Sequence, residues 1–207
     1  MSANPRLKVM VCVPRYPDFA AAKANWVRKA LAQRTEALTA LIAQDPLRVA
    51  AFQPIGFLGR SAVIRSTVVI VDDVWAMVGT SHFRRRGMTF DGSLDVVSID
   101  RSFNGRGTSG DIAHFRQELM ANKLGIEILT GTGDTSALWT RLAEPEASFD
   151  VLASLLSAGG LGHCSPVWSG PTDNGVIAQE ERIADPDGVD ADCSNLLALF
   201  SALIIEN

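Results

Sequence analysis

The stretch from Ile64 to Asp100 decides the fold, and it reads I-R-S-T-V-V-I-V-D-D-V-W-A-M-V-G-T-S-H-F-R-R-R-G-M-T-F-D-G-S-L-D-V-V-S-I-D. Its first apolar run, Val68 to Val71, is rich in β-branched residues and predicts a strand buried on both faces. The pair Asp72-Asp73 predicts a tight turn, because Asp side chains bond to their own backbone. The run from Val74 to Val78 then predicts an antiparallel neighbour, and Ser93 to Ile99 predicts a third strand.

The segments before this stretch predict an α/β fold. Leu7 to Val13 has the composition of a strand, and Arg48 to Gln53 that of a second one. Between them, apolar residues recur every three and four positions from Phe19 to Gln44, which predicts one long helix capped by Asp18. The order strand, helix, strand predicts a parallel pairing. We expect a mixed β-sheet flanked by helices, with Val68 to Val71 as a central strand and the long helix over one face.

The segments after the stretch predict more helices. The pattern predicts a helix that is capped by Ser109 or Asp111, runs to about Lys123 and ends with Leu124-Gly125 as its C-cap. Its predicted apolar face consists of Ile112, Phe115, Leu119 and Met120. Beyond it, the pattern predicts helices at Ser136–Leu142 and Ser148–Ala158 and a closing apolar element at Ser194–Ile205. We therefore divide the chain into residues 1–129, a half-domain with the sheet, and residues 130–207, a helical and irregular extension packed on it.

Composition narrows the classes of function. The chain has 207 residues, of which 47% are hydrophobic, so it can bury a sizeable core. A net charge of −4 argues against a general nucleic-acid binder. No apolar run reaches the roughly 20 residues that a membrane helix needs, and the N-terminus has no signal-peptide pattern, so we expect no transmembrane segment. Three scattered cysteines favour a reducing, cytoplasmic location over a disulfide framework or a metal site.

The stretch resembles the second signature motif of the phospholipase D superfamily. That family has H-x-K-x-x-x-x-D, a short strand, G-S-x-N and an acidic residue on the next strand. In this chain the His, Lys and Asp positions hold Arg65, Thr67 and Asp72. The G-S-x-N positions hold Gly79, Thr80 and His82. The resemblance covers roughly Leu7 to Gly125 and implies a phospholipase D-like half-domain.

The resemblance implies binding of phosphate more than its cleavage. In the family, the His attacks phosphorus, and the Lys and Asn stabilise the charge that develops on the phosphoryl oxygens. Arg65 cannot act as the nucleophile, because its guanidinium stays protonated and has no free lone pair. Thr67 offers a hydroxyl without a charge. The residues left to bind a phosphate-bearing ligand are Arg65, Thr67, Gly79, Thr80 and His82, and we expect no cofactor and no metal.

Only one motif of the two that the family needs is visible, so the chain resembles a carboxyl-terminal half. Three explanations stay open: a fragment of a longer polypeptide, a subunit that pairs with an amino-terminal half carrying an intact motif, and a homodimer. In each of the paired forms, the half buries the face that carries the motif against its partner, and the expected rim consists of Phe57, Leu58 and Phe83.

Two hypotheses of function follow. The first is a non-catalytic half that completes or scaffolds a larger assembly and binds phosphate groups. The alternative is a phosphodiester hydrolase half-site, of phospholipase or nuclease type, whose catalytic His comes from a missing half or partner. Three other features have simpler explanations: Arg84 to Arg86 as a solvated face, His82 as a binding group more than a relocated nucleophile, and Asp185 to Asp192 as an acidic turn more than a calcium site.

Overall fold

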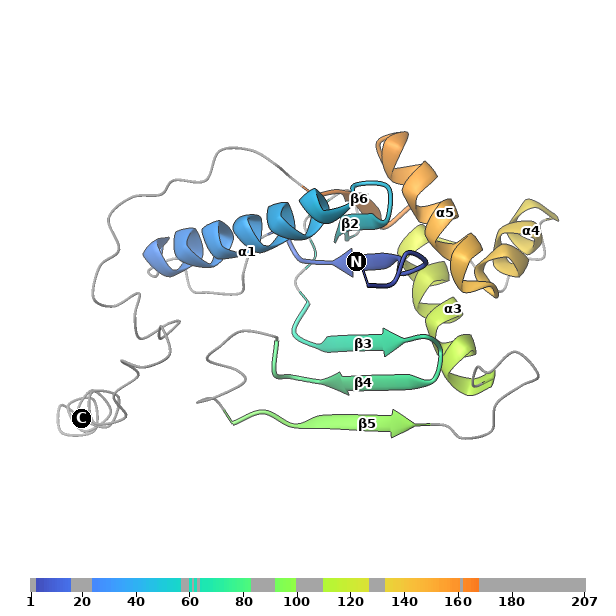
Figure 1. Ribbon diagram of the computed structural model, residues 1–207, viewed down its shortest axis with the longest axis horizontal. Helices are drawn as coiled ribbons and strands as arrows, with labels where there is room; N and C mark the ends of the chain where they lie inside the picture. The colour runs from blue at the N-terminus through green and yellow to red at the C-terminus, as the bar shows by residue number, and fades with distance from the viewer. Residues whose placement is uncertain are drawn as a thin grey trace.

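The computed structural model describes residues 3–15, 24–56, 60, 62, 64–82, 92–99, 110–126, 133–160 and 162–167. Over these residues the chain forms two three-stranded sheets and four helices, so the protein is of mixed α/β class (Figure 1). The helices are α1 (Ala24–Gln44), α3 (Gly110–Leu124), α4 (Gly133–Leu142) and α5 (Pro145–Ser157). In the described part of the chain, no helix combines the length and the apolar character that crossing a bilayer requires.

The first sheet consists of β1 (Val9–Cys12), β2 (Val49–Pro54) and β6 (Cys164–Pro166), in the order β1-β2-β6. β1 and β2 are parallel, as the sequence predicts, and Val9 pairs with Val49. β6 is antiparallel to β2 and falls in a Gly-rich stretch where no strand was predicted. This sheet therefore joins segments that are more than 100 positions apart in the sequence.

Helix α1 connects β1 to β2 and lies beside their sheet (Figure 1). Its described part confirms the predicted long helix, whereas residues 19–23 and the predicted cap Asp18 lie outside the described residues. Leu38 is buried, and Arg34 donates from Nη1 to the carbonyl oxygens of Pro14 and Arg15, the latter at 3.0 Å. These bonds hold the helix against the end of β1.

The second sheet is an antiparallel meander of β3 (Thr67–Val71), β4 (Trp75–Gly79) and β5 (Asp95–Ile99). The turn between β3 and β4 confirms the prediction for Asp72-Asp73. Asp72 and Asp73 have φ values of 52° and 54°, and the Val74 N–H donates to the Val71 carbonyl oxygen at 3.0 Å. Positive φ at both central residues suits a tight hairpin, and Asp adopts it more easily than most residues.

The predicted place of Val68 to Val71 in the fold is wrong. The structure has two separate sheets in place of one mixed sheet, and β3 is at the edge of the second one in its described part. Val68 is 38% exposed and Val71 is 47% exposed, so the strand is not buried on both faces. The physical reason is that β-branched side chains favour extended backbone in any sheet position. The run therefore specifies a strand but does not specify its neighbours.

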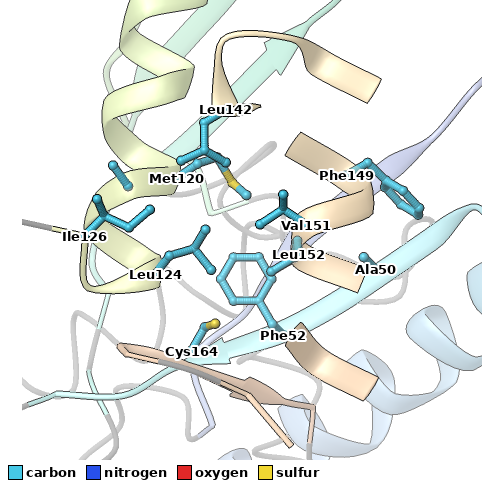
Figure 2. Packing of buried hydrophobic residues seen from close by; sticks show 11 residues of the cluster. Ala50, Phe52, Met120, Leu124, Ile126, Leu142, Phe149, Val151, Leu152 and Cys164 are labelled. Carbon is cyan, nitrogen blue, oxygen red and sulfur yellow. The ribbon is translucent and has the colours of Figure 1, made fainter. Parts of the chain in front are cut away.

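The hydrophobic core lies between the first sheet and the helices α3 and α5 (Figure 2). Phe52 of β2 points into it and lies among Leu124, Leu152 and Cys164, which are 2%, 0% and 1% exposed. The predicted helices at Ser136–Leu142 and Ser148–Ala158 are confirmed as α4 and α5, and α5 contributes directly to this core. Side chains from residues 1–129 and from residues 130–207 thus pack in one interior. Replacing one of the large apolar side chains with Ala lowers the free energy of unfolding by about 2–5 kcal/mol.

The C-terminus of α3 is closed by its own turn and by the turn residue His163, directly before β6. Gly125 has a φ of 68°, its N–H donates to the Asn122 carbonyl at 3.2 Å, and the Ile126 N–H donates to the Ala121 carbonyl at 2.9 Å. This pair of bonds is the Schellman motif and confirms the predicted C-cap. The His163 N–H then donates to the Lys123 carbonyl at 3.0 Å. The end of α3 therefore anchors the segment that leads into the first sheet.

Candidate functional site

The predicted site residues gather at one end of the β3–β4 hairpin, with one exception. Thr67 is the first residue of β3 and pairs with Gly79, the last residue of β4. Arg65 precedes β3, and Thr80 and His82 follow β4. Asp72 is in the turn at the opposite end. β3 lies between Arg65 and Asp72. At about 3.3 Å per residue, its length keeps the two side chains too far apart for an ion pair.

Gly79 is required by its close contact with Asp95 of β5. The register places Thr67, Gly79 and Asp95 in one row across the three strands, with their side chains on the same face. A Cβ atom on Gly79 would lie 1.8 Å from Asp95 Oδ1 and 2.6 Å from Asp95 Cα. Only Gly fits there, and the missing side chain leaves room for a carboxylate at the centre of the site.

The segment after β4 is held by hydrogen bonds from three successive amides. The Thr80 N–H donates to the Leu94 carbonyl at 3.2 Å, and the Ser81 N–H donates to Asp95 Oδ1 at 3.3 Å. The His82 N–H donates to Thr67 Oγ1 at 2.9 Å, and His82 has a φ of 58°. These donors are used within the protein. A ligand at this site would therefore contact mainly side chains. Arg65 and His82 are exposed residues, so their side chains are accessible to it.

The Ser81 hydroxyl is the unusual polar group of the site. Ser81 is 1% exposed, and its Oγ has no hydrogen-bond partner among the residues that the structure describes. A buried hydroxyl without a partner is uncommon, because its desolvation is not compensated. Next to it, Thr67 is also buried, at 8% exposure, and its hydroxyl accepts the His82 amide. The interior of the hairpin end is thus lined by two hydroxyls and the Asp95 carboxylate.

A second polar centre lies at the other end of the hairpin. Asp73, which is 2% exposed, accepts two hydrogen bonds from Arg116 of α3: Nε to Oδ1 at 2.7 Å and Nη2 to Oδ2 at 2.9 Å. Arg116 also donates from Nη1 to Ser148 Oγ at 2.7 Å and to the Leu142 carbonyl at 2.8 Å. This two-point pairing is the strong geometry for Arg and a carboxylate. It ties the β3–β4 turn to α3 and to the α4–α5 connection.

The sequence did not predict this centre, and the predicted buried face of α3 is partly wrong. The predicted apolar face included Phe115 and Leu119, but the buried positions next to Ile112 and Met120 are Arg116 and Gln117. The available signal was the spacing, because Arg116 is four residues from both Ile112 and Met120 and so lies on the apolar stripe. Asp95 was not singled out either, although the motif pattern includes an acidic residue on the next strand.

The remaining histidines and the candidate metal ligands do not add to the site. His114 is on the exposed side of α3, with Nε2 at 3.3 Å from Glu118 Oε1, and its ring packs edge-on against Trp139. Within the described ranges, no three His, Cys, Asp or Glu side chains come together as a metal site. Several predicted features lie outside those ranges and have no structural account: Phe57, Leu58, Phe83, Arg84–Arg86, Asp185–Asp192 and Ser194–Ile205.

Comparison of the whole chain with models of known protein families, with curated proteins and with solved structures finds no match. The resemblance to the phospholipase D superfamily therefore depends on the motif residues and their spacing.

Proposed function

We propose that the chain is a non-catalytic phospholipase D-like half-domain that completes or scaffolds a larger assembly. The proposal depends on the environment of Thr67. At the position of the family's Lys, this chain has a buried hydroxyl that accepts the His82 amide at 2.9 Å. Thr67 thus stabilises the loop, and it has no charge to offer a phosphoryl group. Arg65, at the position of the nucleophile, has no lone pair for attack on phosphorus.

One face of the second sheet has the apolar character of a surface that binds a partner. Beyond the row of Thr67, Gly79 and Asp95, the same face continues with the apolar rows Val69–Met77–Val97 and Val71–Trp75–Ile99. We call these three rows the site face. Val71, Val97 and Ile99 are 47%, 48% and 62% exposed. A contiguous apolar surface next to a polar site is typical of an interaction surface. The partner that fits is an amino-terminal phospholipase D-like half, a separate subunit with an intact motif, or a second copy.

The proposal includes the binding of a phosphate-bearing ligand by the side chains of Arg65 and His82. Because the amides of Thr80, Ser81 and His82 donate within the protein, the ligand contacts would come from Arg65 and His82. The double variant Arg65→Ala with His82→Ala should lose the binding of inorganic phosphate in a calorimetric titration. Arg141→Ala removes an exposed Arg from the last turn of α4 and is the matched control. Equal binding by both variants would contradict this part.

The assembly is tested by the native mass of the complex that contains the chain. We expect a mass above the 22.2 kDa of one chain and loss of the partner in Val97→Glu, which puts a charge on the site face. Leu47→Glu, on an apolar residue that is 84% exposed on another surface, should leave the complex intact. A monomer at micromolar concentration with no partner, or a complex that ignores Val97→Glu, would contradict the proposal. Phosphodiesterase activity of the intact complex would favour the alternative, a hydrolase half-site completed by the partner's His.

A further inference from the structure

Arg34 of α1 is a partly buried cation whose guanidinium is only partly used by the protein. Its Nη1 donates to the carbonyl oxygens of Pro14 and Arg15, the latter at 3.0 Å, and these bonds fix the position of the group. A guanidinium has five N–H donors, and the two on Nη1 are the ones used. Its Nε is buried, and neither Nε nor Nη2 has a hydrogen-bond partner among the residues that the structure describes. We call Nε and Nη2 the open edge of Arg34.

Arg116 shows which chemical group such an edge binds in the same protein. Its Nη1 also donates to a carbonyl oxygen, that of Leu142 at 2.8 Å. Its Nε and Nη2 bind the two carboxylate oxygens of Asp73, at 2.7 and 2.9 Å. Two N–H donors on one side of a guanidinium match the two oxygens of a carboxylate. Arg34 and Arg116 therefore use Nη1 alike, and they differ at the edge that holds a carboxylate beside Arg116.

The electrostatics of Arg34 also indicate that an anion is missing. Burial lowers the pKa of Arg34 below its usual value, and no carboxylate of the described residues raises it again. A partly buried charge without an opposite charge is unfavourable, because it loses hydration and gains no ion pair. The bonds to the two carbonyl oxygens offset part of this cost. An anion at the open edge would supply both the missing hydrogen bonds and the missing charge.

The position of Arg34 in the fold is one where α/β proteins bind ligands. Pro14 and Arg15 follow β1, which is parallel to β2, and α1 lies beside this end of the strand (Figure 1). Ligands of open α/β sheets bind outside the carboxyl ends of parallel strands. Arg15 brings a second positive charge to the same strand end.

These observations together define a ligand class. Arg34 is only partly exposed, which favours a small molecule over a protein surface, and the match with Arg116 favours a carboxylate over a phosphate. We propose that the open edge of Arg34 binds the carboxylate of a small-molecule ligand at the carboxyl end of β1. This site is on the first sheet, whereas Arg65 and His82 are beside the second, so the inference is independent of the proposed function.

The test follows the Nε–H signals of the arginines in NMR spectra of the full chain while sodium acetate is added at constant ionic strength. We expect the Arg34 signal to shift and to reach a plateau. Two signals in the same spectrum are controls: Arg116, whose edge Asp73 occupies, and Arg141, which is exposed on α4. Neither should reach a plateau.

A conservative variant tests the geometry of the edge. Arg34→Lys keeps the positive charge but lacks the planar pair of donors. Acetate binding, followed at the Arg15 backbone amide, should become at least about ten times weaker. The variant Arg65→Ala with His82→Ala should bind acetate with unchanged affinity, which separates this site from the proposed phosphate site.

Several results would overturn the proposal. A shift at Arg34 that stays linear and equals that at Arg141 would show a general effect of salt. Equal acetate binding by Arg34→Lys, loss of acetate binding in the variant of Arg65 and His82, or a plateau with phosphate but not with acetate would also overturn it. So would an Arg34 Nε–H that exchanges as slowly as that of Arg116 before acetate is added, because the edge would then have a partner within the chain. If Arg34→Lys does not fold, the three arginine signals of the parent protein decide.

Discussion

Arg116 reaches from α3 to Asp73 in the β3–β4 turn and bonds both carboxylate oxygens, at 2.7 and 2.9 Å. The pair links the second sheet to the core of the first, because α3 packs in that core and Asp73 lies in the turn that joins β3 to β4. A buried, two-point ion pair therefore holds the turn of the second sheet to α3. The orientation of the candidate site therefore depends on a residue at the far end of the hairpin.

Removing the guanidinium should leave a buried carboxylate without its charged partner. Arg116→Ala is expected to lower the free energy of unfolding by about 3–5 kcal/mol, measured by urea denaturation. The exposed pair of Lys8 and Asp150, at 2.8 Å, provides the control. Asp150→Asn should change the free energy by about 0–1 kcal/mol. Similar small effects of both substitutions would show that the buried pair does not hold the sheets together.

The contact between Gly79 and Asp95 predicts a steric effect. Gly79→Ala places a methyl group 2.6 Å from the Asp95 Cα atom, so backbone has to move. We expect a loss of about 1–3 kcal/mol of stability. Gly92→Ala meets no atom within 4 Å and should stay within about 0.5 kcal/mol of the parent. Thermal unfolding of the two variants distinguishes them, and a neutral Gly79→Ala would refute the close approach.

The hydroxyl of Thr67 predicts a local effect on the loop. Thr67→Val keeps the shape of the side chain but removes the acceptor of the His82 N–H, at a cost of about 0.5–1.5 kcal/mol. Hydrogen exchange of the His82 amide should become faster, while Thr67→Ser restores its protection. Thr39→Val, at an exposed position of α1, is the control. Unchanged exchange at His82 would mean that Thr67 does not hold the segment.

The ion pair of Asp45 and Arg48, in the connection between α1 and β2, predicts a dependence of stability on pH. The hydrogen bond from Arg48 Nε to Asp45 Oδ2, at 2.6 Å, lowers the pKa of Asp45 below its usual value, and the bond from the Leu47 amide adds to this. The stabilisation is therefore present above the ordinary carboxyl pKa and disappears as pH falls through the lowered one. In an NMR titration, Arg48→Gln should raise the pKa of Asp45. An unchanged pKa would rule out Arg48 as the cause.

The sequence predicts the local elements better than their arrangement. Asp72-Asp73 predicts the hairpin because the turn depends on the preferences of adjacent residues. The position of Val68 to Val71 at a sheet edge depends on which distant segments pair with it, and its composition does not encode that. β6 shows the same limit, since the three residues Cys164 to Pro166 become a strand only because Phe52 and Pro54 pair with them.

The candidate site shows a similar division. Thr67, Gly79 and His82, which the motif resemblance groups as ligand-binding residues, lie at one end of the hairpin, and their role in binding stays a prediction. Between two adjacent Asp residues, however, only burial reveals that Asp73 has the structural partner. Its partner, Arg116, is 43 positions away, so no local pattern connects the two.

We propose that this chain, as a phospholipase D-like half, does not catalyse phosphodiester hydrolysis. This central claim is tested most directly by the turnover of a chromogenic phosphodiester by the purified chain, measured beside His82→Ala. We expect both proteins to give the background rate, because Arg65 cannot attack phosphorus and Thr67 cannot neutralise the developing charge. Turnover above background that disappears in His82→Ala would contradict the account, since it would show that His82 acts as the nucleophile.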